Sequence, residues 1–255
     1  MKFGLMEDKA GFAAVWENVF GDPADFVLQF TRAYPKDCFY AAVGENGETA
    51  SILSLLPICF SSENENRPAR YLYAVATDEK YRGQGLSSKL FSEAMKILQE
   101  PLVFTVPAEE SLFAFYRKQG FINWSDCADL RFYAKKKALT AEKIDAESYI
   151  ALREKLLSGK AHIVFTAREV QFAGQGYRIS DGQSEGILLG DLRGNEWLFQ
   201  ECIGFPAEEA ASAVAKEGEI CRVIGQGSDR AFSMVYDKCE KTDFSEENIF
   251  GLAMM

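Results

Sequence analysis

The pattern of apolar and polar residues in the first half of the chain predicts an alternation of helices and strands. Apolar residues recur at helical spacing between Asp8 and Phe20. Asp22 followed by Pro23 is typical of the start of a second helix, with the Asp22 carboxylate as its N-cap. Further helices are expected at residues 87–98 and 110–119, and strands at residues 38–43, 49–60, 71–77, 102–106 and 130–134. The polar segment 61–68 is expected to be an exposed loop.

The second half repeats this order in a shortened form. Helices are expected at residues 146–157 and 206–216, and strands at residues 172–180, 186–193, 196–203, 220–224 and 231–236. Two glycine-containing segments, residues 174–176 and 225–227, do not precede helices, so we interpret them as turns. The second half is therefore predicted to be an α+β domain with the same general order as the first.

The distribution of charge changes near residue 139. Residues 1–139 hold 16 basic and 18 acidic residues, whereas residues 140–255 hold 12 basic and 20 acidic residues. No Pro-rich or Gly-rich linker marks the change. We therefore expect two domains, residues 1–138 and residues 139–255, that pack against each other.

Composition narrows the class of protein. A hydrophobic content of 47% is enough for a packed core, and a net charge of −10 disfavours nucleic acid as a partner. The longest apolar stretch, residues 50–60, is too short and too interrupted to span a membrane, and the first ten residues lack a signal-peptide pattern. One histidine and six scattered cysteines do not have the spacing of a metal site. We expect a cytoplasmic protein with reduced cysteines that binds no metal, nucleic acid or membrane.

A glycine-containing turn connects a predicted strand to a predicted helix. It reads Arg82-Gly83-Gln84-Gly85-Leu86-Ser87-Ser88. The glycines allow successive backbone N–H groups to point into one concavity, and the start of the helix adds partial positive charge. A pyrophosphate group fits such a site, although an ordinary strand-to-helix turn would show the same pattern.

The turn and a second segment together resemble the GNAT acetyltransferase superfamily. Residues 82–87 match the signature R-x-x-G-x-[GA], with Ser87 in the last small position. Residues 115–121, FYRKQGF, resemble the second landmark of the family, F-Y-x-x-x-G-F, and the resemblance extends over residues 3–136. The tandem order resembles the enhanced-intracellular-survival type of acetyltransferase, with a degenerate second GNAT-like domain that lacks the phosphate turn. A sterol-carrier-like α+β module is the alternative for that half.

The resemblance implies a fold, a donor and a reaction. The fold would be a mixed α+β sheet in which the strand ending at residue 77 splays from the strand at residues 102–106. Acetyl-CoA would lie in this gap and donate its acetyl group directly to an amine on a small molecule or a peptide. A backbone N–H near Val75 or Ala76 would stabilise the developing oxyanion. The residues expected to bind the donor are Val75, Ala76, Thr77, Arg82, Gly83, Gln84, Gly85, Leu86, Ser87, Ser88 and Ser111.

The resemblance also implies two groups for proton transfer. Tyr116 would be the general acid that protonates the departing thiolate; simple packing beside its aromatic neighbours is the alternative. The first half contains no histidine, and Glu109 and Asp78 are weak candidates for the base. In the relatives the terminal carboxylate serves as the base, which here is Met255. The apolar tail, residues 249–255, is expected to dock, either as a strand on the core or with this carboxylate in the cleft of the N-terminal domain.

The sequence does not determine which amine accepts the acyl group, which oligomeric state the protein has, or whether the protein turns over a substrate at all. The acidic second half would attract a cationic amine such as a polyamine, an aminoglycoside or a lysine-containing peptide, although acidity that serves solubility is the commoner explanation. A homo-oligomer is compatible with the sequence. A non-catalytic acyl-CoA-binding sensor or scaffold is the alternative to an enzyme.

Overall fold

One mixed β-sheet runs through the described part of the molecule. The structure is a computed structural model and describes residues 1–63, 65–239, 242 and 248–249. The strands are β1 (Lys2–Leu5), β2 (Phe39–Val43), β3 (Thr49–Ser62), β4 (Glu65–Thr77), β5 (Leu102–Thr105), β6 (Ile122–Tyr133), β7 (Thr140–Ile144), β8 (Ala161–Val164), β9 (Gln175–Ser180), β10 (Glu185–Arg193), β11 (Glu196–Ile203), β12 (Ile220–Asp237) and β13 (Asn248–Ile249). The helices are α1 (Lys9–Phe20), α2 (Ala24–Ala33), α3 (Leu86–Ile97), α4 (Glu110–Lys118), α5 (Ala146–Leu156), α6 (Ala167–Ala173) and α7 (Ala207–Val214).

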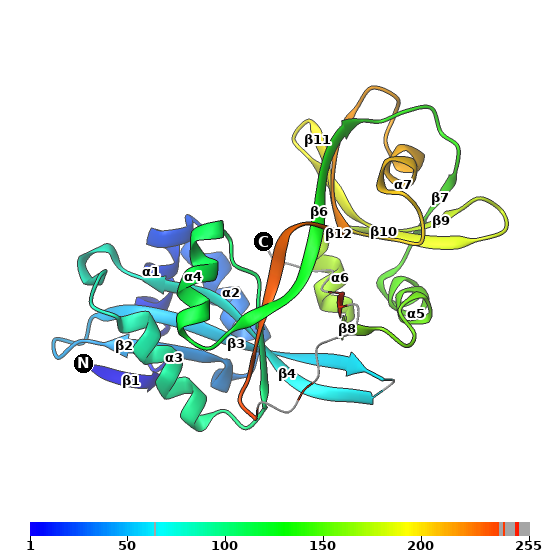
Figure 1. Ribbon diagram of the computed structural model, residues 1–255. Helices are drawn as coiled ribbons and strands as arrows, with labels where there is room; N and C mark the ends of the chain where they lie inside the picture. Colours follow the sequence, from blue (N-terminus) through cyan, green and yellow to red (C-terminus); the bar gives the residue numbers. More distant parts are fainter. Residues whose placement is uncertain (64, 240–241, 243–247, 250–255) are drawn as a thin grey trace.

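The order of the strands places the two halves of the chain at the two ends of the sheet. The order is β1-β2-β3-β4-β5-β12-β11-β10-β9-β7, with β6 paired to β12 and β8 paired to β3 and β13. Figure 1 shows α1 to α4 gathered around the N-terminal part and α5 to α7 around the C-terminal part. Among the described helices, none combines the length and the apolar character that crossing a bilayer requires.

The first half differs from the sequence pattern in three places. The pattern does not predict β1, and β6 begins at Ile122 rather than at residue 130. The segment 61–68, expected to be a loop, is largely strand, because β3 and β4 pair in register as far as Ser62 and Glu65. On its other edge β3 pairs with β8, so this polar hairpin is held by strands on both sides of β3.

The second half of the chain differs from the sequence-based expectations in more places than the first half. The strand expected from residue 172 begins at Gln175, because α6 ends at Gly174, whose φ is +130°. The pattern also does not predict β7, β8 or α6. The turn expected at residues 174–176 is wrong beyond Gly174, because Gln175 and Gly176 already belong to β9. The turn expected at residues 225–227 is wrong as well, because these residues lie inside β12. The strand accommodates them in an irregularity of its register with β6 between Gly225 and Arg230.

Strand β12 belongs to both parts of the sheet. Its first residues, Ile220 to Val223, pair in parallel with β11. Its last residues, Met234 to Asp237, pair antiparallel with β5 of the first half. Figure 1 shows β6 and β12 running side by side between the two parts. Part of the first-half sheet is therefore built from residues far beyond 139, while the division into domains near that residue stays a prediction.

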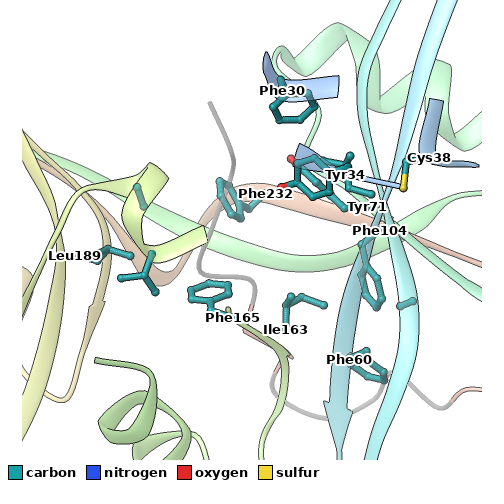
Figure 2. Close-up of a cluster of buried hydrophobic side chains, with 14 of the residues drawn as sticks. Phe30, Tyr34, Cys38, Phe60, Tyr71, Phe104, Ile163, Phe165, Leu189 and Phe232 are labelled. Carbon is teal, nitrogen blue, oxygen red and sulfur yellow. The ribbon is translucent and has the colours of Figure 1, made fainter. Parts of the chain in front are cut away.

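An apolar core continues from one half into the other. Figure 2 shows Phe60 and Phe104 of the first half with Ile163, Phe165 and Phe232 of the second in one cluster. The rings of Phe60 and Phe104 have their centroids 5.4 Å apart. Burial of large apolar side chains on this scale contributes roughly 1.5–3 kcal/mol for each residue. The two halves therefore stabilise each other.

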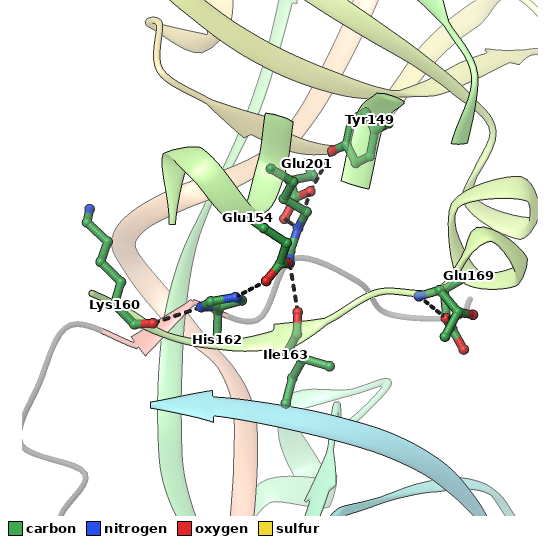
Figure 3. A network of polar contacts seen from close by, with 9 residues as sticks. Tyr149, Glu154, Lys160, His162, Ile163, Glu169 and Glu201 are labelled. Carbon is green, nitrogen blue, oxygen red and sulfur yellow. Dashed lines mark hydrogen bonds and ion pairs between the residues drawn. The ribbon is translucent and has the colours of Figure 1, made fainter. Parts of the chain in front are cut away.

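A buried ion pair lies at the centre of the second half (Figure 3). Arg153 on α5 is 0% exposed, and its Nε donates to both carboxylate oxygens of Glu201 on β11 at 3.1 and 3.0 Å. The Tyr149 hydroxyl donates to the same carboxylate at 2.5 Å, and Arg153 Nη1 donates to the carbonyl oxygen of Ile163 at 2.7 Å. The network therefore joins α5 to β11 and to β8, and both charges depend on it for their solvation.

We expect Arg153→Met to destabilise the protein by about 3–5 kcal/mol, because it leaves the Glu201 carboxylate buried without its partner. Urea unfolding measures this loss. Arg131→Met is the matched control, because Arg131 pairs with Glu196 at 2.7 Å but its side chain is 66% exposed. The control is expected to change the free energy of unfolding by no more than about 1 kcal/mol. Equal losses in the two variants would contradict the role of the buried pair.

Candidate active site

The site begins where β4 and β5 diverge. The two parallel strands pair only at Arg70 with Val103 and at Tyr71 with Phe104. Beyond this point β4 continues to Thr77 without a strand partner on that edge among the described residues. A cavity of about 380 Å³ lies at the divergence and is lined by both strands, α1 and α4. The splayed pair expected from the sequence is therefore present.

A bulge lies in the part of β4 that lines this cavity. Ala74 has a φ of +51°, and the register between β3 and β4 shifts there. A left-handed conformation costs an alanine about 1–2 kcal/mol, and such strain concentrates at functional sites. A bulge interrupts the ladder, so that backbone groups of Ala74 and Val75, which both line the cavity, are freed from strand pairing.

The turn after β4 presents a row of free backbone donors. Gly83 and Gly85 have φ values of +76° and +70°, and Gly85 is the N-cap of α3 without a side-chain cap. The first hydrogen bond of the helix runs from the Lys89 N–H to the Gly85 carbonyl oxygen at 3.1 Å. No described residue accepts a hydrogen bond from the backbone N–H groups of residues 83–88. These donors, at the positive end of a helix, fit a diphosphate.

Side chains fix the turn relative to β4 and α4. The hydroxyls of Thr77 and Ser87 are hydrogen-bonded at 2.7 Å. Gln119 Nε2, just after α4, donates to the Ser88 hydroxyl at 2.8 Å, and Arg82 Nε donates to the Thr77 carbonyl oxygen at 3.3 Å. Leu86 is buried, whereas the residues from Arg82 to Gly85 are exposed. Side-chain hydrogen bonds to β4 and to the end of α4 therefore hold the turn in place, while its backbone donors remain open to solvent.

Tyr116 lies in the cavity at the divergence of β4 and β5. It is 7% exposed and its ring packs against Phe115 and Phe121, with centroids at 5.1 and 5.5 Å. Burial raises the pKa of Tyr116 to about 12, and a side-chain hydrogen bond with Thr105 opposes this shift. The phenol therefore keeps its proton at neutral pH, as a general acid must.

Other residues expected at the site lie elsewhere. Ser111 is exposed, its hydroxyl is 3.4 Å from a carboxylate oxygen of Glu109, and neither residue lines the cavity. The Asp78 carboxylate accepts a hydrogen bond from the Lys80 backbone N–H at 3.0 Å, which uses it as a local cap. The Met255 carboxylate lies outside the described residues. Of the tail, only Ile249 is described; it ends β13, which pairs in parallel with β8.

Of the described residues that line the cavity, sequence reasoning named only Val75 and Tyr116 as site residues, and the charged residue that it missed is Asp22. The expectation that Asp22 caps the second helix is wrong, because α2 has Pro23 as its N-cap and no side-chain cap. Instead, Asp22 Oδ2 accepts a hydrogen bond from Trp16 Nε1 at 2.8 Å, and both side chains line the cavity. The available signal was an acidic residue two positions after the end of a helix that carries several aromatic residues toward the core.

Comparison with known proteins defines the class. Residues 6–122 match the family model described as an acetyltransferase (GNAT) domain. Most of the first half of the chain therefore matches a GNAT acetyltransferase domain. A search of curated proteins gave no match.

Solved structures share the fold over almost the whole chain. A GCN5-related N-acetyltransferase from Anabaena variabilis is 12% identical and superposes with a TM-score of 0.68, over 92% of this chain and 72% of its own. One from Kribbella flavida is 12% identical with a TM-score of 0.64, over 92% and 70%. Eis1 from Mycobacterium abscessus is 9% identical with a TM-score of 0.64, over 93% and 73%. The expected fold class, a GNAT fold followed by a degenerate GNAT-like second half, is confirmed.

We expect Gly85→Val to weaken coenzyme A binding by about tenfold or more, because a β-branched side chain does not adopt the left-handed conformation that aims the N–H groups of the turn. Calorimetric titration with coenzyme A measures the affinity. Gly47→Val is the matched control, since Gly47 has a φ of +86° in a hairpin turn and a Cβ there also meets open space. Affinity that falls equally in both variants, or in neither, would remove the turn from the binding site.

Proposed function

We propose that the protein transfers an acetyl group from acetyl-CoA to a primary amine by direct attack, without a covalent enzyme intermediate. One observation carries this proposal. β4 ends in a turn with free backbone donors, and the same strand lines the cavity that contains the buried, protonated Tyr116. The class of the domain supports acyl transfer in general, and this arrangement supports a donor with a diphosphate at one end and a reactive carbonyl at the other.

The free edge of β4 and the turn would hold the donor. The backbone N–H groups of residues 83–88 would bind its diphosphate. The strand edge beyond Tyr71 would pair with the amide groups of the pantetheine arm as an added strand does. A backbone N–H of Val75 or Ala76, next to the bulge, would stabilise the negative charge that develops on the thioester carbonyl oxygen. Ser111 remains a proposed contact, although it lies outside the cavity.

Tyr116 would donate its proton to the sulfur as the carbon–sulfur bond breaks. A thiolate that leaves without a proton is a good nucleophile for the reverse reaction, so protonation drives the transfer forward. The amine must lose a proton before it attacks, because a primary ammonium group has a pKa of about 10. We retain the Met255 carboxylate as a proposed acceptor of that proton, since neither Glu109 nor Asp78 lines the cavity.

Tyr116→Phe tests the acid. We expect kcat to fall by about 100-fold, because the general acid is lost while the ring still fills its site. Steady-state assays with acetyl-CoA, together with calorimetry for coenzyme A, separate the rate from donor binding, which is expected to stay unchanged. Tyr133→Phe serves as the control, since Tyr133 is 68% exposed and lies outside the cavity. Unchanged turnover in Tyr116→Phe would refute the acid; donor binding without transfer to any amine would identify a sensor or scaffold.

The pH dependence of the wild type gives a second test. Tyr116 acts in its protonated form and its pKa is raised to about 12, so its contribution is present below that pH and is lost only above it. The rate should therefore rise as the amine loses its proton and show no decline due to Tyr116 up to pH 10. A decline with an apparent pKa below 10 that disappears in Tyr116→Phe would contradict this assignment. Rates measured from pH 6 to 10 decide the question.

A further inference from the structure

The cavity that contains Tyr116 has one charged group and several aromatic walls. Asp22 is the charged side chain among the described residues that line it. Five aromatic residues of α1, β4 and α4 also line it: Trp16, Phe20, Tyr71, Tyr73 and Tyr116. An acidic group in such a setting is attractive for a cation, because carboxylate and aromatic faces both favour positive charge.

The Asp22 carboxylate is held in position and is not used elsewhere. Its Oδ2 accepts the Trp16 Nε1–H at 2.8 Å. Trp16 is 1% exposed, and its ring packs against Phe30 at 5.3 Å and Tyr73 at 5.6 Å between centroids, so the donor cannot turn away. Within the described residues the carboxylate caps no helix and pairs with no basic side chain. One oxygen is therefore available to a ligand.

The charge of Asp22 acts inside the cavity. Burial is the main cause that raises the pKa of Tyr73 to about 12, and the negative charge of Asp22 is the next. Tyr73 is thus a neutral phenol beside the Asp22 carboxylate. Tyr71 has its pKa raised by burial as well and also remains neutral.

We propose that Asp22 and the surrounding rings form the acceptor subsite, and that this subsite selects an amine with a single positive charge on an apolar body, such as an arylalkylamine. The inference rests on the proposed function, because it assigns the acceptor of the same reaction. An ammonium group donates to the free Asp22 oxygen, and the apolar body packs against Phe20 and Tyr73, which are partly exposed and line the cavity. Among the described residues that line the cavity, a polycation meets no carboxylate besides Asp22, so its other charges would lose water without a partner there.

Binding of 2-phenylethylamine to the protein saturated with coenzyme A tests the subsite without requiring turnover. Calorimetry on the wild type is expected to show tighter binding of 2-phenylethylamine than of spermidine or of the neutral analogue 2-phenylethanol. Asp22→Asn should weaken the binding of 2-phenylethylamine by about 10- to 100-fold, which is the range for one charge-assisted hydrogen bond. The same variant should leave the affinity for 2-phenylethanol unchanged. Asp22→Glu, which keeps the charge, should retain most of the affinity.

Asp25→Asn is the matched control. Asp25 lies three residues further along the chain, is exposed and does not line the cavity, so the same loss of charge there is expected to leave amine affinity within twofold. Thermal unfolding of both variants checks that Asp22→Asn is folded. The inference is overturned if no amine binds the wild type, if spermidine binds more tightly, or if the two Asn variants behave alike.

The same samples separate this inference from the proposed function. If 2-phenylethylamine binds through Asp22 but is not acetylated when acetyl-CoA replaces coenzyme A, the proposed function fails and the subsite stands as a cation site. If amines are acetylated with equal kcat/KM by the wild type and by Asp22→Asn, the proposed function stands and the assignment of Asp22 is refuted.

Discussion

The pairing between β5 and the end of β12 is the interaction on which the site depends. β5 is four residues long and pairs with β4 at only two positions, whereas all four of its residues pair with β12. A strand can leave one neighbour only if its backbone groups are satisfied by the other, because unpaired buried N–H and C=O groups are costly. β12 supplies that partner, and β3 does the same for β4. The cleft between β4 and β5 is therefore maintained by residues from the opposite end of the chain.

β4 arranges the chemistry of the site along a single strand. At its end, the turn offers backbone donors for an anion; near its middle, the cavity holds Tyr116 and the carboxylate of Asp22. These features favour opposite charges, so their separation along the strand gives a donor and a cationic acceptor different places to bind. The bulge at Ala74 lies in the wall of the cavity, where the ladder is interrupted and backbone donors would face the reacting carbonyl in the proposed complex.

The second half repeats the arrangement of β4, α3 and β5 without its phosphate turn. β11 and β12 are parallel, are connected through α7, and pair over four residues before they diverge around a cavity of about 480 Å³. The helix, however, begins after Pro206, and its first turn contains Glu208 and Glu209. Acidic side chains at a helix N-terminus occupy its positive potential, which disfavours a phosphate there. The second half therefore keeps the strand–helix–strand geometry of the first half but lacks the positive potential of a phosphate site. This explains why the second half shares the fold and does not contain the glycine-containing phosphate motif.

The sequence alone determined those features that depend only on neighbouring residues along the chain. Gly83 and Gly85 mark the turn because left-handed backbone favours glycine, and helical spacing placed Tyr116 on α4. Only the tertiary structure decided the role of Asp22, because a carboxylate after a helix can cap the next helix or bind an indole, and the position of Trp16 selects between them. It also decided that residues 225–227 continue a strand. Their partner, β6, lies about a hundred residues away in sequence, and periodicity along the chain carries no information about pairing at that distance.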